Sequence, residues 1–190
     1  MKETLSVFAG LLAVPGYILY IRAILQKKSK KKPARVSWFI WAGLDVIVLA
    51  GMFFKKTINT QIVIATIGAF IVSGLAINYG TPGWKKLDIF CIIGAIVGVG
   101  LWKTFNNPLF GIIMGLASIF IGSFPTFVSA WEDPSREDKL AWSFFLASPI
   151  FTALAIPFPH WTLSNVAQPI TFSIISAITM FVLCVRPRLI

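Results

Sequence analysis

The sequence predicts an all-α integral membrane protein with seven transmembrane helices, arranged as two parallel three-helix repeats joined by a linker helix (3+1+3). Three observations support this prediction: the composition, a series of apolar runs of membrane-spanning length, and an internal repeat. The chain is 57% hydrophobic and only 13% charged, with a mean hydropathy of +0.82. A soluble domain of 190 residues has no core large enough to bury that much apolar surface.

Charged residues, proline, glycine and asparagine divide the chain into apolar runs. A helix needs about 20 residues to cross a hydrocarbon core of about 30 Å. We therefore expect seven spanning helices near residues 4–25, 36–54, 60–79, 87–102, 108–130, 139–156 and 166–185. The runs are apolar on every face, whereas strands of a transmembrane barrel alternate with a period of two. The first run is longer than a signal-peptide core and has no clear cleavage site, so we expect it to be the first spanning helix.

A weak internal repeat relates residues 15–45 to residues 125–149. Each stretch contains an apolar helix with a proline, a charged loop, and a second apolar helix that begins near a tryptophan. The aligned pairs are Trp38 with Trp142, Trp41 with Phe145, and Asp45 with Pro149. Such a repeat indicates that the architecture is built from two equivalent units.

The repeat divides the chain into a first three-helix bundle, residues 1–80, a linker region with the fourth helix, residues 81–106, and a second three-helix bundle, residues 107–190. A single linker helix lets both bundles enter the membrane in the same direction. The bundles are then related by an axis along the membrane normal.

Basic residues set the expected orientation. One side of the predicted topology collects Arg22, Lys27, Lys28, Lys30, Lys31, Lys32, Arg35, Lys85, Lys86, Arg136, Lys139, Arg186 and Arg188, and the other side has only Lys2, Lys55, Lys56 and Lys103. The positive-inside rule places the N-terminus outside and the C-terminus in the cytoplasm. Short loops without an Asn-x-Ser/Thr acceptor favour the bacterial plasma (inner) membrane.

Several classes of function are disfavoured. The net charge of +10 lies in short loops rather than on one basic face, so we expect no nucleic-acid partner. Cys91 and Cys184 lie far apart inside apolar runs, and the chain has one histidine, His160, so no disulfide framework or metal site is indicated. We expect neither an enzyme nor a bound cofactor.

The chain resembles the SWEET and PQ-loop superfamily of small-solute membrane transporters. The resemblance rests on the 3+1+3 arrangement, the outside N-terminus, Pro15 and Pro125 in the first helix of each repeat, and a basic loop that leads to Ser37-Trp38. It implies a solute carrier. Nicotinamide riboside transporters have a similar helix arrangement, so the fold does not determine the ligand.

The sequence also departs from the pattern of that superfamily. PQ-loop proteins have glutamine after the proline, where this chain has Gly16 and Thr126. SWEETs have a proline in the second helix of each repeat, which only Pro149 matches, because Asp45 stands at the equivalent position of the first repeat. The resemblance therefore implies a fold and a general mechanism more than it implies a sugar substrate.

Asp45 is the first candidate binding residue. An aspartate in the middle of a spanning helix costs about 2.5 to 3.5 kcal/mol on insertion scales, so it should face a cavity or a partner. Trp38, Trp41 and Asp45 are spaced three and four residues apart and share one helix face. This face is expected to line a central cavity in which Asp45 binds solute or carries protons. The alternative is a protonated aspartate that holds two helices together.

Further candidates follow from the repeat and from polar residues at membrane depth. Trp142 is the counterpart of Trp38, and Ser73, Ser173 and Ser176 could complete a binding site, although such hydroxyls often bond to their own helix. The helix prolines Pro15, Pro125 and Pro149 are candidate gating points, because a proline removes one backbone hydrogen bond and kinks the helix; static kinks are the alternative.

The loops that join the first two helices of each repeat differ in charge. Residues 26–35 are strongly basic, whereas residues 131–139 are net acidic. The two loops could attract one another across the inner mouth. Alternatively, the basic loop sets the topology and binds anionic lipid while the acidic loop is solvated.

The leading hypothesis is a carrier that moves a small polar or aromatic solute by alternating access, with protons as a potential coupling ion. Its partners are then the solute and the lipid bilayer, and a homo-oligomer is left open. The alternative is a membrane receptor or assembly factor that uses the same fold to bind a protein or peptide.

Overall fold

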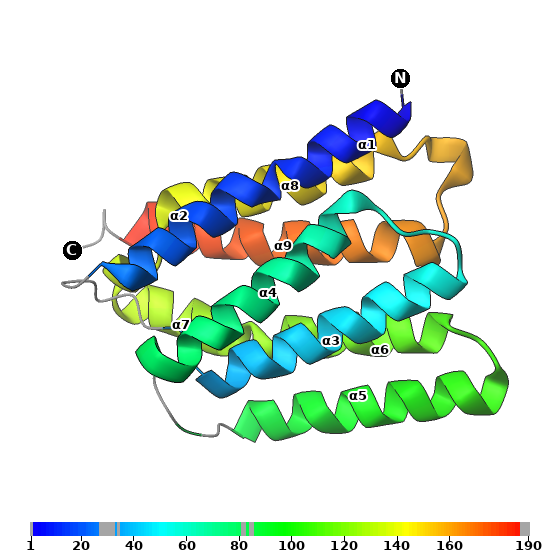
Figure 1. The fold of residues 1–190 in the computed structure, drawn as a ribbon, viewed down its shortest axis with the longest axis horizontal. Helices are drawn as coiled ribbons and strands as arrows, with labels where there is room; N and C mark the ends of the chain where they lie inside the picture. The colour runs from blue at the N-terminus through cyan, green and yellow to red at the C-terminus, as the bar shows by residue number, and fades with distance from the viewer. Residues whose placement is uncertain (1, 27–32, 34, 81–82, 84–85, 187–190) are drawn as a thin grey trace.

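The computed structural model describes residues 2–26, 33, 35–80, 83 and 86–186 (Figure 1). This part of the chain is helical and contains no strand. In chain order the elements are α1 (Lys2–Leu11), α2 (Ala13–Leu25), α3 (Arg35–Phe54), α4 (Thr60–Tyr79), α5 (Lys86–Phe105), α6 (Leu109–Gly122), α7 (Phe124–Glu132), η1 (Pro134–Arg136), α8 (Lys139–Ala155), η2 (Phe158–His160) and α9 (Leu163–Val185).

Within the described residues, six helical segments are long and apolar enough to cross a membrane. They are Thr4–Leu25, which comprises α1 and α2, then α3, α4, most of α5, Leu109–Glu132, which comprises α6 and α7, and α9. The apolar helix α8 is shorter, with 17 residues. The prediction of an all-helical membrane protein is confirmed at this level.

The six long segments and α8 run alternately in opposite directions along the chain (Figure 1). The start of α1 lies at the same end as the α3–α4, α5–α6 and α8–α9 connections, and α9 finishes at the opposite end. The described basic residues near the end where α9 finishes are Arg22, Arg35, Lys86, Arg136, Lys139 and Arg186, and those near the other end are Lys2, Lys55, Lys56 and Lys103. Of the predicted basic loop, residues 26–35, residues 27–32 and 34 lie outside the described part of the chain.

Six helical segments close into a ring: α1–α2, α3, α4, α6–α7, α8 and α9. Helix α4 packs against α1, α2 and α3, and α9 packs against α6, α7 and α8. The ring is completed by contacts of α1 and α2 with α8 and by contacts of α3 with α6. Helix α5 lies outside this ring, against α6 and α3. The ring brings segments from both halves of the sequence around one axis.

Two spanning segments are broken where the prolines predict it. The first segment is interrupted at Leu12, three residues before Pro15, and the fifth at Ser123, two residues before Pro125. Each proline therefore lies in the first turn of the following helix, where a backbone N–H has no intrahelical acceptor. Pro149 lies inside α8, and Pro169, which the sequence analysis did not single out, lies inside α9.

The start of the last helix differs from the prediction. Helix α9 begins at Leu163 rather than near residue 166. The reason is a capping box, in which the Thr162 side chain accepts from the backbone of Asn165 while the Asn165 side chain accepts from the Thr162 N–H at 2.9 Å. These bonds satisfy amide groups that would otherwise lack a partner in the first turn.

Glycines allow close packing of α6 against its neighbours, as small residues do in membrane helices. A Cβ added at Gly98 of α5 would lie 2.6 Å from Cβ of Met114, and one added at Gly115 would lie 2.8 Å from a methyl group of Val48. Helices α5 and α3 therefore approach α6 too closely for larger residues at these points.

Candidate binding cavity

A cavity of about 100 Å³ lies within the ring. Its walls come from α2, α3, α4, α8 and α9 and from the region where α6 meets α7 at Ser123. Every segment of the ring contributes at least one side chain, and α5, outside the ring, contributes none. The cavity is thus a product of the whole ring.

Aromatic side chains form most of the wall. The lining includes Tyr17, Tyr20, Trp38, Trp41, Trp142, Phe145 and Phe172. Most of them form a continuous chain of ring contacts: the centroids of Trp41 and Trp38 are 5.3 Å apart, those of Trp38 and Tyr20 5.5 Å, and those of Tyr17 and Phe145 4.8 Å. Trp142 packs edge-on against Phe145 at 5.6 Å. These contacts position the rings before any ligand binds.

Asp45 carries the one carboxylate of the lining and lies halfway along α3. Its side chain is 5% exposed. Among the described residues, no group donates a hydrogen bond to this carboxylate and no cation pairs with it. A buried polar group normally has a partner, because losing water without replacement costs free energy. Asp45 is therefore placed to interact with something that enters the cavity.

Three of the four hydroxyl groups that line the cavity donate their protons to backbone carbonyl oxygens. Tyr17 Oη donates to the carbonyl oxygen of Ala65 at 3.1 Å, and Ser176 Oγ donates to that of Phe145 at 3.0 Å. Ser123 Oγ donates to the carbonyl oxygen of Ile119 at 2.8 Å. What these hydroxyls retain for a ligand is acceptor lone pairs.

A chain of amides determines which atoms Gln61 presents. The backbone N–H of Ile62 donates to Asn59 Oδ1 at 2.9 Å, so Asn59 Nδ2 donates to Gln168 Oε1, also at 2.9 Å. Gln168 Nε2 in turn donates to Gln61 Oε1. Because the carbonyl of Gln61 is occupied, its NH₂ group remains available at the cavity wall near the start of α4.

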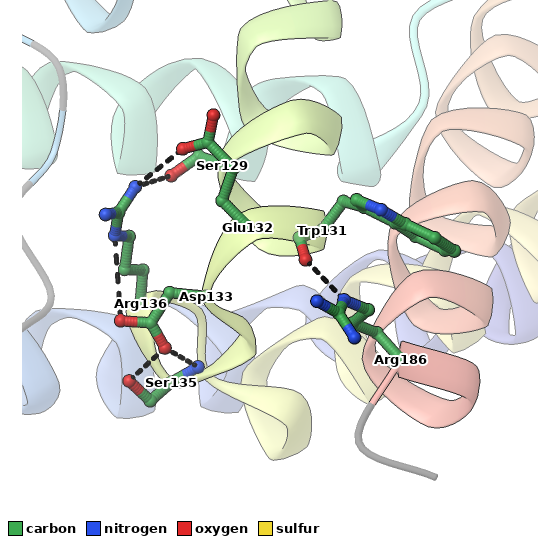
Figure 2. A network of polar contacts seen from close by, with 7 residues as sticks. All are labelled: Ser129, Trp131, Glu132, Asp133, Ser135, Arg136 and Arg186. Carbon is green, nitrogen blue, oxygen red and sulfur yellow. Dashed lines mark hydrogen bonds and ion pairs between the residues drawn. The ribbon is translucent and has the colours of Figure 1, made fainter. Parts of the chain in front are cut away.

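The opposite end of the cavity meets the α7–α8 loop. Trp142 Nε1 donates to Glu137 Oε2 at 2.8 Å. In the same loop, Arg136 Nη1 lies 3.2 Å from Glu132 Oε2, and Arg136 Nε lies 3.7 Å from Asp133 Oδ2 (Figure 2). Two acidic residues, Glu132 and Asp133, thus pair with the nearby Arg136. Most of the predicted basic partner loop falls outside the described residues.

This loop is also connected to the C-terminal end of α9. Arg186 Nε donates to the carbonyl oxygen of Trp131 at 3.0 Å, and its guanidinium lies 5.7 Å from the centroid of the Trp131 ring (Figure 2). The end of α7 is therefore held against α9 by both a hydrogen bond and a cation–π contact.

The structure brings five of the predicted binding residues together at the cavity: Trp38, Trp41, Asp45, Trp142 and Ser176. Two others lie elsewhere. Ser73 is buried between helices and donates to the carbonyl oxygens of Ala69 at 2.7 Å and Trp38 at 2.9 Å. Ser173 has a buried hydroxyl without a partner among the described residues, but it does not line the cavity.

The gating candidates are not part of the cavity wall. Pro15 and Pro125 stand beside the helix breaks, and Pro149 is buried inside α8. The break in the fifth segment does reach the cavity, because Ser123 lines it. His160 is exposed in η2, as expected of a loop residue.

Eleven of the sixteen lining residues were not predicted from the sequence. Phe145 was aligned with Trp41 but not selected, and Tyr17, Tyr20 and Gln61 were not considered. A signal for Tyr17 and Tyr20 was present, since they lie three residues apart on one face of a proline-containing helix. Gln61 gave none, because a polar residue in the first turn of a spanning helix is ordinary.

In comparisons with known proteins, no family model matches this chain, and no curated protein or solved structure is significantly similar to it.

Proposed function

We propose that this protein is a membrane carrier that moves a small polar or aromatic solute by alternating access between two three-helix bundles. The observation that carries this proposal is the cavity: it lies inside a ring of spanning segments, all of which line it, and it exposes the unpaired carboxylate of Asp45. Carriers commonly bind solute near the bilayer midplane, at the interface between structural repeats.

The helix contacts support two equivalent bundles, residues 1–80 and residues 107–190, with α5 as the linker. In each bundle the third segment, α4 or α9, packs between the other two. The bundles meet through α1 and α2 with α8, and through α3 with α6, and these contacts exchange under a twofold rotation of the bundles. This arrangement agrees with the resemblance to the SWEET and PQ-loop superfamily. In that arrangement, rocking of one bundle against the other would open either end of the cavity.

The proposed orientation follows the distribution of charge. The end of the molecule that carries Arg22, Arg35 and Arg136 would face the cytoplasm, and the N-terminus would lie outside. The membrane would be the bacterial inner membrane. Asp45 would be the group that couples solute movement to protons, because a carboxylate exposed in the cavity can bind a proton or a solute.

Uptake into proteoliposomes tests the carrier proposal. Purified protein should take up radiolabelled solutes faster than empty vesicles, a pH gradient should change the rate, and Asp45→Asn should abolish the effect of the gradient. Glu132→Gln is the matched control, since it also neutralises one carboxylate but on an exposed residue at the end of α7. Absence of flux for sugars, amino acids and amines alike, together with stable co-purification of a protein partner, would instead favour a receptor or assembly factor.

A further inference from the structure

We propose that the solute is a small organic monocation, which the carboxylate of Asp45 neutralises inside an aromatic cage. This inference rests on the proposed function and names its substrate class. Four properties of the cavity support it: the charges of the lining residues, their aromatic rings, the donors and acceptors of the lining hydroxyl groups, and the cavity volume.

The balance of charge is the first argument. Asp45 lines the cavity, and none of the sixteen lining residues is a lysine, an arginine or a histidine. The carboxylate has no hydrogen-bond donor or counter-ion within the described part of the chain. An unpaired buried carboxylate is costly, and a cationic ligand supplies the missing charge. An anionic ligand would add a second negative charge to the same space.

The aromatic wall favours a cation independently of Asp45. Seven of the sixteen lining residues are aromatic. The faces of these rings carry negative electrostatic potential and attract cations, most strongly where water is excluded. Tyr20 and Trp38, which pack together at 5.5 Å, place such rings on α2 and α3, and Phe145 does so on α8.

The hydrogen bonds of the lining hydroxyl groups also favour a cation. Tyr17, Ser123 and Ser176 donate their protons to backbone carbonyl oxygens, so they offer acceptors to the cavity. An ammonium group brings donors and needs acceptors. A sugar would need donors as well as acceptors around its ring. The NH₂ of Gln61 offers a donor near one end of the cavity, and the indole N–H of Trp41, unpaired among the described residues, lies against Gly122.

The volume of the cavity favours a small cation. Its value of about 100 Å³ is below that of a cavity of about 150 Å³ that holds one benzene, so a ligand of about four to five non-hydrogen atoms fits within it. Tetramethylammonium has this size and a permanent charge. tert-Butyl alcohol has the same number of heavy atoms and a similar shape without the charge, and it is therefore the matched neutral probe.

The experiment measures binding to the purified full-length protein in detergent by titration calorimetry. Tetramethylammonium or methylammonium should bind, and tert-butyl alcohol should bind at least about tenfold more weakly. Asp45→Asn should lower the affinity for the cations by about tenfold or more and leave that for tert-butyl alcohol unchanged. Phe172→Leu keeps an apolar wall but removes one ring face, and should lower cation affinity roughly two- to fivefold.

Three results would overturn the proposal: neither cation binds the wild-type protein, the alcohol binds as tightly as the cations, or Asp45→Asn leaves cation affinity unchanged. A size-exclusion profile like that of the wild type shows that each variant is folded. Uptake of radiolabelled tetramethylammonium into proteoliposomes separates this inference from the proposed function. Cation binding without flux contradicts the carrier alone, whereas flux of neutral solutes without cation binding contradicts the cation alone.

Discussion

Asp45 and Asp88 are two buried carboxylates with different surroundings. Asp88, in the first turn of α5, accepts a hydrogen bond from Ser37 Oγ at 3.1 Å and thereby connects α5 to α3. Asp45 has no such donor among the described residues and faces the cavity. A carboxylate whose role is to hold two helices together has a hydrogen bond to the second helix, as Asp88 has. The contrast argues against a purely structural role for Asp45.

This contrast predicts opposite effects of the same truncation. Asp88→Ala should lower the free energy of unfolding by about 1–3 kcal/mol, because Ser37 loses its buried acceptor. Asp45→Ala should leave stability unchanged or raise it, because no partner is lost and a buried charge is removed. Thermal unfolding in detergent measures both effects. A destabilisation by Asp45→Ala as large as that by Asp88→Ala would indicate that Asp45 supports the fold.

The hydrogen bonds of Gln168 allow a second prediction about stability. Its amide is fully buried and lies between Asn59 and Gln61, so it joins α9 to α4. Gln168→Leu leaves the partly buried donor of Asn59 and the buried acceptor of Gln61 without partners, and should cost about 1–3 kcal/mol of stability.

The matched control for Gln168→Leu is Thr179→Val in the same helix. Thr179 is also fully buried, but its hydroxyl bonds only to the carbonyl oxygen of Ile175 in α9, at 3.0 Å. Its replacement should cost less than about 1 kcal/mol, since no contact between helices is lost. Chemical unfolding in mixed micelles measures both variants, and equal costs would mean that the amide chain does not hold α4 and α9 together.

At the scale of elements, the position of α2 against α8 depends on Gly16. A Cβ at this position would lie 2.7 Å from Cε1 of Phe145, so the ring of Phe145 must shift. Because Phe145 lines the cavity, Gly16→Ala should weaken binding of the solute or of tetramethylammonium several-fold, as titration calorimetry would show. Gly74→Ala is the control, because nothing lies within 4 Å of its added Cβ. Unchanged binding by Gly16→Ala would show that the ring can move away from the cavity.

The break between α6 and α7 makes a separate prediction about movement. Pro125 lies beside Ser123, the residue at which the break meets the cavity. Pro125→Ala restores a backbone donor and should straighten the segment. We expect slower uptake with cation affinity changed less than about twofold, because the wall stays intact. Pro157→Ala, in the α8–α9 connection, is the control. Uptake at the wild-type rate would identify Pro125 as a static kink.

At the scale of the whole molecule, the described basic residues gather at the end where α9 finishes. Positive charge of this kind faces the cytoplasm in most membrane proteins. In a background without Cys91 and Cys184, Lys56→Cys should react with a membrane-impermeant maleimide added to intact cells, and Arg136→Cys should react only after the cells are broken. The reverse labelling pattern would invert the proposed orientation.

Sequence patterns along the chain account for much of the fold. The span of α4 matches the prediction, that of α3 differs by one residue, and the broken first and fifth segments lie where Pro15 and Pro125 indicated. One face of α3 could also be identified, because the helical period places Trp38, Trp41 and Asp45 together. The start of α9 could not, because a capping box rather than hydropathy determines it.

The sequence by itself determined that the chain is a helical membrane protein, where its apolar helices lie and which face of α3 is polar, because hydrocarbon thickness and the helical period act along the chain. Only the tertiary structure decided that α5 lies outside the ring, that Tyr17 and Phe145 meet across it, and that Gln61 presents a donor. These features depend on lateral packing in the bilayer. In the bilayer the hydrophobic effect does not determine which helices pack together. Close fit and interhelical hydrogen bonds between residues far apart in the sequence determine it.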